Sequence, residues 1–238
     1  MSAVSPRGPF RAVLFDLGNT LVNEKDFNRV ERLAEGTGLR VDAEGLAHVF
    51  REVEEEFDRG SASTSGEEVW REVVRRCAAA PPTDDAISLF LSALRRDEAP
   101  VEVFSDVGRC LDELRERGLA LGVVTDGRDE PAARRVLERA HLAPYFRAVV
   151  ASETEGFAKP DPRIFHRAVE RIGSTPERTI YVGDLATVDA RAAAAAGLTG
   201  VWLHRDGTGW IDDPPEITSL LELPGWIDRA EASAGRSR

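Results

Sequence analysis

The chain has 238 residues, of which 42% are hydrophobic and 31% charged, enough for one substantial core with a smaller attached lobe and unlike a disordered protein. Acidic residues outnumber basic ones by 42 to 31, and the net charge of −11 argues against a nucleic-acid partner. Cys77 and Cys110 lack metal-ligand spacing, residues 1–10 contain no apolar signal core, and no apolar run approaches the roughly 20 residues of a membrane span. We therefore expect a cytoplasmic protein with no membrane partner.

The first predicted element is a buried strand at 12–15, and four amphipathic helices follow it without an intervening strand. Their apolar residues recur at helical spacing, and glycine or polar residues bound them. The predicted helices cover 27–34, ending at Gly36; 46–57, after Asp42; 69–77, after Ser65; and 87–94, after Thr83. Four consecutive helices predict a small bundle inserted behind the first strand.

After Pro100, short apolar runs alternate with helical stripes. The runs at 119–125, 148–151, 179–182 and 200–203 are typical of buried strands. Glycines end the helices between them: Gly118, Gly173 and Gly197. This alternation predicts an α/β fold with a doubly wound parallel sheet.

These patterns divide the chain into three parts. We predict an α/β core from residues 10–21 and 101–222, and a helical lobe from residues 22–100. Residues 223–238 end in a stretch rich in Ala, Ser and Arg, and we expect them to form a partly disordered tail.

Polar residues stand at the carboxyl ends of the predicted strands, where open α/β sheets bind their ligands. Asp16 follows the first strand, Thr125 ends the second, and Asp184 follows the fourth, with Asp189 five residues further on. Lys159 precedes the helix after the third strand. Carboxylates suit Mg²⁺, a hydroxyl and an ammonium suit phosphate oxygens, and a carboxylate can act as a nucleophile. The set therefore predicts a phosphoryl-transfer site with a magnesium ion.

The same segments, in this order, resemble the four motifs of the haloacid dehalogenase superfamily, and the helical insert resembles that family's C1-type cap. The resemblance covers roughly residues 10 to 205. It implies that Asp16 is the nucleophile, phosphorylated during turnover, and a Mg²⁺ ligand, and that Asp184 and the backbone carbonyl of Gly18 also bind the metal. The resemblance further implies that Asp189 holds metal-bound water or orients Lys159. Thr125, Asp126, Gly127 and Lys159 would bind the phosphoryl group.

Two positions depart from the family pattern. Gly18 stands where the family's phosphatases usually carry a second Asp, which acts as general acid and base. Asp126 stands where Asn is commoner, which keeps an oxygen acceptor but loses donors. A cap residue such as Asp26 is a candidate substitute for the missing acid.

The lysine content supports a special role for Lys159. The chain contains 29 arginines, and its only lysines are Lys25 and Lys159. A chain that uses Arg so widely is expected to keep Lys where a compact charge matters.

We therefore predict a Mg²⁺-dependent phosphatase that hydrolyses a small phosphorylated metabolite, as a monomer or homodimer. A 2-haloacid dehalogenase is one alternative. Resemblance to such an enzyme would call for Tyr at position 18, and the pair Asp184 and Asp189 argues for a metal that it does not need. A phosphonatase needs a cap amine, for which Lys25 is the candidate. A non-catalytic phosphate-binding regulatory protein is the alternative from another class, because Gly18 removes the usual acid.

Overall fold

The computed structural model describes residues 10–23, 26–60, 66–96, 101–205, 207 and 214–236. The chain divides into two compact units, Met1–Asn23 with Val101–Arg238, and Glu24–Pro100. The first is called the core unit below, and the second the helical unit. Within the described residues, no helix is long and apolar enough to cross a membrane.

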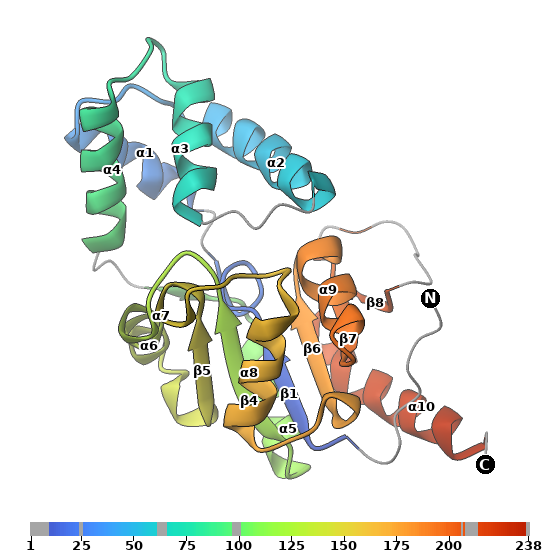
Figure 1. Ribbon diagram of the computed structural model, residues 1–238. Coiled ribbons are helices and arrows are strands. Elements are labelled where there is room, and N and C mark those ends of the chain that lie inside the picture. Colours follow the sequence, from blue (N-terminus) through green and yellow to red (C-terminus); the bar gives the residue numbers. More distant parts are fainter. Residues whose placement is uncertain are drawn as a thin grey trace. The chain divides into compact units, whose positions relative to one another are not determined.

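A six-stranded parallel sheet forms the centre of the core unit, in the order β5-β4-β1-β6-β7-β8 (Figure 1). The strands are β1 (Ala12–Phe15), β4 (Ala120–Thr125), β5 (Ala148–Ala151), β6 (Thr179–Gly183), β7 (Thr199–Leu203) and β8 (Glu216–Ile217). The predicted α/β class is confirmed. The short strand β8 was not predicted, because its two residues carry no periodic signal of their own.

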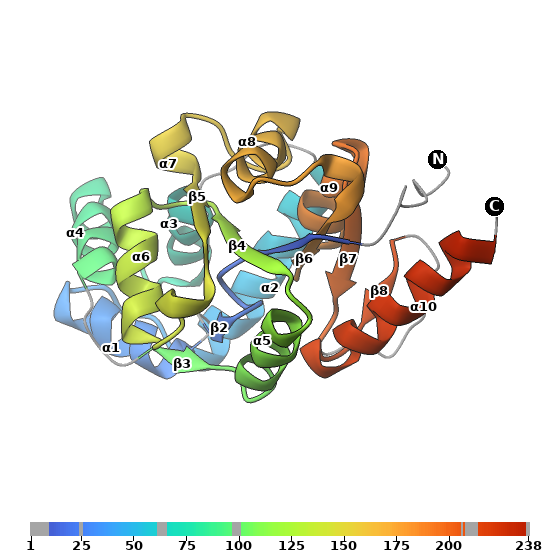
Figure 2. The same cartoon turned by 90° about the horizontal axis from the view of Figure 1, so that it is seen from below.

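Helices cover both faces of this sheet (Figure 2). The helices α5 (Val107–Glu116), α6 (Glu130–Arg139) and α10 (Leu223–Arg236) contribute to the apolar core on one face, and α8 (Pro162–Ile172) and α9 (Ala192–Ala195) to the core on the other. The remaining short elements are α7 (Ser152–Glu155), η1 (Ala143–Tyr145), η2 (Pro176–Arg178), the π-helix η3 (Ala186–Arg191) and η4 (Leu220–Glu222).

The prediction of a partly disordered tail is wrong for residues 223–236, which form α10. Leu223 and Ile227 lie one turn apart and are buried in the core. Arg117, the C-cap residue of α5, binds the Asp228 carboxylate at 2.7 Å and the Pro224 carbonyl at 3.1 Å. The Ala- and Ser-rich composition did not indicate the apolar residues through which this helix packs against α5 and η4.

The helical unit contains α1 (Phe27–Gly36), α2 (Ala43–Gly60), α3 (Gly66–Cys77) and α4 (Asp84–Arg96). Its core includes Val30, Leu46, Val73 and Ile87, one from each helix. Trp70 packs against this core at 4.8 Å between its ring centroid and that of Phe50.

Two short antiparallel strands adjoin the junctions with the helical unit. They are β2 (Val22–Asn23) and β3 (Glu102–Val103), and both belong to the core unit. Their pairing is the reason that the boundary between the units falls after Asn23, whereas the sequence placed it after residue 21.

Candidate active site

Parallel strands bring the predicted residues to one edge of the sheet. The central strand β1 pairs with β4 on one side and β6 on the other. Asp16 directly follows β1, Thr125 ends β4 and Asp184 directly follows β6. The Asp16 N–H donates to the Val182 carbonyl at 2.9 Å, which fixes the nucleophile candidate beside the β6 backbone. The fold therefore places three of the predicted residues at the carboxyl ends of neighbouring strands.

Lys159 reaches this edge from the segment between α7 and α8. Its Nζ atom lies 2.6 Å from Asp16 Oδ1 and 2.7 Å from Asp189 Oδ1. Asp126 Oδ2 is a third carboxylate oxygen, 4.0 Å from the same nitrogen. The Lys159 side chain is only 4% exposed, so these contacts are shielded from water. A buried ammonium thus joins carboxylates that are far apart in the sequence.

Asp189 occupies the wide turn of the π-helix η3 and is fully buried. Its Oδ1 atom accepts from the Tyr181 hydroxyl at 3.1 Å, and its Oδ2 atom accepts from the Leu185 N–H at 3.0 Å. Two glycines permit this packing. A Cβ atom on Gly183 would lie 2.3 Å from the Asp189 Cγ atom, and one on Gly200 would lie 1.9 Å from the carbonyl oxygen of the adjoining Ala190.

The charges of this cluster do not balance. One ammonium faces the carboxylates of Asp16, Asp126 and Asp189. Burial raises the pKa of Asp16 to about 7, although Lys159 opposes the rise. Burial likewise raises the pKa of Asp126. Burial disfavours the charged form of Lys159, but Asp16 and Asp189 hold its pKa well above the ordinary value. Lys159 is therefore a fixed cation among carboxyls that are hard to ionise together.

The loop after β4 holds the other predicted phosphate ligands. Thr125 is buried, and its hydroxyl donates to the Asp126 carbonyl at 3.4 Å. The Asp126 carboxylate accepts from the Lys159 N–H at 3.3 Å, while the Gly127 N–H donates to Ser152 Oγ at 3.1 Å. The side-chain oxygen of Asp126 therefore accepts a hydrogen bond from the Lys159 backbone, a role that the side-chain oxygen of Asn could also fill.

Gly18 lies in a tight turn between β1 and β2. It forms an isolated bridge with Val22, and Asn19 beside it has φ 55°. The described glycines with positive φ are Gly38, Gly118, Gly127, Gly156, Gly173 and Gly197. Gly18 is outside this group, so its backbone conformation is open to a residue with a side chain.

Three further residues support the site, and sequence reasoning missed them. Tyr181 donates to Asp189, Ser152 accepts from Gly127, and Trp202 Nε1 donates to the Asp184 carbonyl at 2.9 Å. Tyr181 and Trp202 lie within strands, where the apolar pattern predicts only sheet core. A polar atom on an aromatic side chain near a strand end is the signal that would have identified both.

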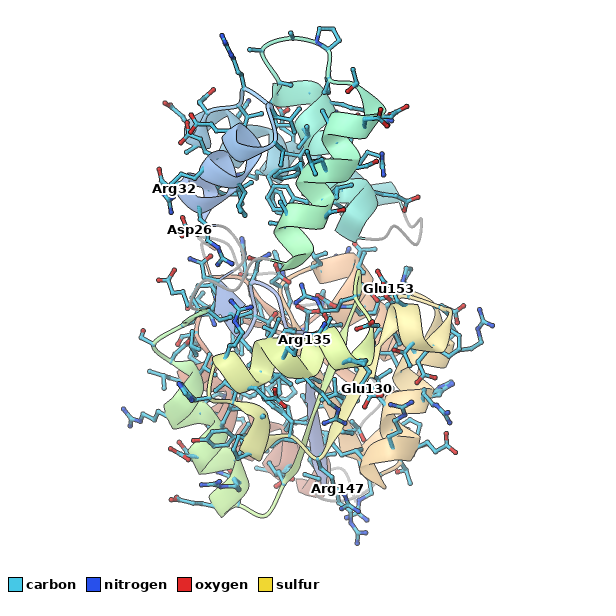
Figure 3. All side chains as sticks on the ribbon, turned by 90° about the vertical axis from the view of Figure 1, so that its left-hand side faces the viewer. Asp26, Arg32, Glu130, Arg135, Arg147 and Glu153 are labelled. Atoms are coloured by element: carbon cyan, nitrogen blue, oxygen red, sulfur yellow. The ribbon has the colours of Figure 1, made fainter. Side chains whose placement is uncertain are left out.

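The candidates at the start of the helical unit have other placements. Asp26 lies at the start of α1 (Figure 3) and accepts from the Arg29 N–H at 3.1 Å, so it caps that helix. Lys25 lies outside the described residues. If Asp26 replaces the missing acid, its carboxylate must therefore serve both as a general acid and as the cap of α1.

A magnesium site at this edge of the sheet would draw on the carboxylate oxygens of Asp16 and Asp184. Within the described residues, no group of three or more His, Cys, Asp or Glu side chains is arranged to hold a metal ion. Magnesium, however, is commonly bound through only one or two carboxylates and keeps several waters. Asp16 and Asp184 stand on adjoining strand ends, in a region with excess negative charge, so the chemistry of the donors fits this ion.

Taken together, the parallel sheet and the polar cluster at its carboxyl edge define a hydrolase-type α/β site. Residues 10–197 match the family described as haloacid dehalogenase-like hydrolase. The chain belongs to this family, as the motif resemblance predicted, and it is a hydrolase.

Individual relatives agree with this assignment. A phosphoserine phosphatase of Thermus thermophilus is 33% identical over 90% of this chain and 88% of its own. A glyceraldehyde 3-phosphate phosphatase of Methanopyrus kandleri is 32% identical over 82% of this chain and 84% of its own. The fold is shared with the HAD-hydrolase YfnB of Bacillus subtilis bound to magnesium, with a TM-score of 0.71, 22% identity, and coverage of 92% of this chain and 99% of that one.

Proposed function

We propose that this chain is a cytoplasmic, Mg²⁺-dependent phosphatase that hydrolyses a small phosphorylated metabolite through an aspartyl phosphate on Asp16. The observation that carries the proposal is the buried Lys159 ammonium, 2.6 Å from Asp16 and 2.7 Å from Asp189 at the end of β1. The phosphatases among the relatives support this reaction over others on the same fold. The free thiols of Cys77 and Cys110 are compatible with a reducing compartment.

In the proposed first step, an Asp16 carboxylate oxygen attacks phosphorus, and the bond from phosphorus to the leaving oxygen breaks. Lys159 and Thr125 would bind the phosphoryl oxygens. In the second step, water hydrolyses the acyl phosphate, which releases inorganic phosphate and restores the carboxylate. Because Lys159 is buried and permanently charged, it would stabilise negative charge without reorganising.

The residues that would hold magnesium are Asp16, Asp184 and the backbone carbonyl of Gly18. The chemistry that bound Mg²⁺ supplies is neutralisation of charge on the phosphoryl group. Trp202 would steady this arrangement, because its indole N–H holds the Asp184 carbonyl. Of the two roles proposed for Asp189, the contacts favour orientation of Lys159, since both carboxylate oxygens of Asp189 already accept hydrogen bonds from protein groups.

The helical unit, residues 24–100, would act as the C1-type cap and supply substrate specificity. Phosphoserine and glyceraldehyde 3-phosphate are the substrates named for the two relatives above, so they are the first compounds to assay. The dehalogenase alternative gives no role to the acidic pair Asp184 and Asp189. The phosphonatase alternative depends on Lys25, and Lys25→Met tests it directly.

The substitution Asp16→Asn tests the proposed reaction. We expect it to lower phosphate release by at least about 10³-fold, because the variant lacks a nucleophilic carboxylate. Asp112→Asn is the matched control, since Asp112 lies on α5 with a side chain 52% exposed. Excess chelator should abolish wild-type turnover, and added Mg²⁺ should restore it. Equal turnover by the Asp16→Asn variant, or full turnover in chelator, would contradict the proposal.

The substitution Gly18→Asp tests whether another residue already supplies the general acid that is missing at position 18. If no group replaces the acid, alkyl phosphate hydrolysis should rise by about 10²-fold or more. Aryl phosphates should gain less, because their leaving groups are already stable anions. A folded variant with no gain on either class would indicate that a substitute such as Asp26 already supplies the proton. A wild-type protein that binds phosphate but turns over no substrate would favour the regulatory alternative.

A further inference from the structure

Arg205, two residues beyond β7, binds the turn that follows the nucleophile. Its Nη2 atom donates to the Thr20 carbonyl at 2.7 Å, and its Nε atom donates to the Asn19 carbonyl at 3.3 Å. The same guanidinium binds both oxygens of Asp106, at 2.9 and 3.1 Å. Its carbon atom Cζ lies 3.9 Å from the Phe104 ring centroid. One side chain therefore joins the 17–21 turn to the segment that leads from β3 into α5.

Asp106 is itself held by hydrogen bonds, so the carboxylate that Arg205 binds has a fixed position. Its Oδ2 atom accepts from the Ser219 hydroxyl at 2.8 Å and from the Leu220 N–H at 2.9 Å. The Asp106 side chain is 9% exposed, and that of Arg205 is 20% exposed. A planar guanidinium bound to a carboxylate through two nitrogens has little rotational freedom. The positions of its remaining N–H groups are thereby set.

Besides Arg205, the Phe104 N–H also binds the 17–21 turn, by donating to the Leu21 carbonyl at 3.3 Å. Inside the turn, the Leu21 and Val22 amides donate to the Leu17 carbonyl at 3.0 and 3.1 Å. The side-chain atoms Asn19 Oδ1 and Thr20 Oγ1 are buried but have no hydrogen-bond partner in the part of the chain that the structure describes. Asn19 also has a φ of 55°, which is uncommon for a residue other than glycine. Arg205 therefore supplies hydrogen bonds to a turn in which Asn19 Oδ1 and Thr20 Oγ1 form none.

We infer that Arg205 is a positioning residue, which acts through the Asn19 and Thr20 carbonyls to hold the turn that carries Gly18 next to Asp16. The inference deepens the proposed function and rests on it for the catalytic consequence. The positional claim itself concerns only the conformation of the 17–21 turn. Arg205 touches neither Asp16 nor Lys159, so its effect on turnover should be indirect.

Hydrogen exchange in Arg205→Met tests the positional claim without substrate or metal. We expect exchange of the amides in 17–22 to quicken by about tenfold or more, while β4 and β6 keep their protection. Arg117→Met is the matched control, because Arg117 also binds carboxylates, at Glu113 and Asp228, and a carbonyl, at Pro224. It joins α5 to α10 and has no contact with the turn, so it should leave exchange in 17–22 unchanged.

Arg205→Lys covers the case in which Arg205→Met does not fold. A lysine can reach Asp106 or one carbonyl, but it cannot reproduce the four bonds of the guanidinium. We expect local exchange between that of the wild type and the Met variant. Unchanged exchange in 17–22 in a folded variant, or an equal rise throughout the core unit, would overturn the inference.

Kinetics distinguish failure of this inference from failure of the proposed function. In an active enzyme, Arg205→Met should lower kcat by about 10- to 100-fold with KM little changed, because the misplaced turn affects the reacting geometry and not substrate contacts. Calorimetric titration of Mg²⁺ should give weaker binding to the Arg205→Met variant than to Arg117→Met. If the wild type hydrolyses no phosphate ester, the proposed function fails, while the exchange result still decides the role of Arg205.

Discussion

Two ion clusters in the described part of the core unit, one around Lys159 and one around Arg205, differ in kind. In the lysine cluster, one ammonium at Lys159 faces the carboxylates of Asp16, Asp126 and Asp189. In the arginine cluster, the guanidinium of Arg205 faces the single carboxylate of Asp106, and neutral donors and acceptors complete the bonding of both. The first cluster has an excess of negative charge, and the second is balanced.

This difference in charge balance distinguishes a cluster suited to binding a ligand from one that only stabilises the fold. A balanced, fully bonded pair lowers the pKa of its carboxyl, and Asp106 shows this effect. In the lysine cluster, burial raises the pKa values of Asp16 and Asp126, the neighbouring carboxylates add to the rise, and the single ammonium of Lys159 only partly opposes it. Such an arrangement is unfavourable for the folded chain alone and is typical of positions that bind a cation or a substrate. The following predictions test whether the two clusters behave in these two ways.

The largest expected effect is on stability, from Lys159→Met in the presence of chelator. The substitution leaves buried carboxylates without their counter-ion, so the free energy of unfolding should fall by about 3–5 kcal/mol. Urea unfolding at pH 8 measures it. Arg167→Met is the control, because Arg167 binds Glu155 and Glu170 with a side chain 42% exposed, and its loss should change stability little. Similar losses in both variants would remove the distinction between a buried cluster and a surface pair.

Magnesium should stabilise the lysine cluster specifically. At a free Mg²⁺ concentration of 100 times Kd, binding to the native state alone adds about 2.7 kcal/mol, which a thermal melt detects as a raised Tm. Asp184→Asn should abolish most of this shift, because it removes a proposed ligand. Asp106→Asn should lower the shift less than Asp184→Asn does, since it removes no proposed ligand and affects Gly18 only through Arg205 and the 17–21 turn. No shift in the wild type would count against a divalent site.

The arginine cluster should show a pH dependence of its own. Burial works to raise the pKa of Asp106, but hydrogen bonds from Arg205, Leu220 and Ser219 outweigh it, and the folded-state pKa lies below the ordinary 3.8. A lowered folded pKa contributes stability that is present above the unfolded pKa and lost as the pH falls through the folded value. Asp106→Asn should therefore cost about 1–3 kcal/mol at pH 7, and the difference from the wild type should shrink below pH 4. A difference that stays constant down to pH 2 would contradict this assignment.

Sequence patterns predicted the parallel sheet and the strand ends at which the candidate site residues lie, because both rest on local signals. The apolar runs and the polar residues that follow them locate β1, β4 and β6, and parallel strands must bring Asp16, Thr125 and Asp184 to one edge. The 29 arginines also made Lys159 conspicuous, although no pattern gave its distance from Asp16.

The unpredicted features depend on tertiary contacts. The helix α10 packs against α5 and η4 and buries Leu223 and Ile227 in the core, which its Ala-rich composition does not reveal. The π-helix that buries Asp189 depends on close approach at Gly183 and Gly200, and glycines at strand positions have many other uses. Arg205 had no signal at all, because its partners lie about 99 and 185 residues away in the chain.

The smallest predicted effect comes from Tyr181, which lies between the sheet core and the lysine cluster. Its ring packs edge-on against Phe165 at 5.0 Å between centroids, and its hydroxyl donates to Asp189 at 3.1 Å. Tyr181→Phe keeps the ring and removes only the hydrogen bond, so the free energy of unfolding should fall by about 0.5–1.5 kcal/mol. Asp189 then keeps Lys159 and the Leu185 N–H as partners, and kcat should decrease only slightly, by about twofold to fivefold.

Tyr145→Phe is a matched control, since its exposed hydroxyl donates to Asp112 at 2.9 Å and should affect neither kcat nor stability appreciably. If Tyr181→Phe and Tyr145→Phe have the same kcat and stability, the hydroxyl of Tyr181 has no part in fixing Asp189, and the position of Lys159 depends on its carboxylate neighbours alone.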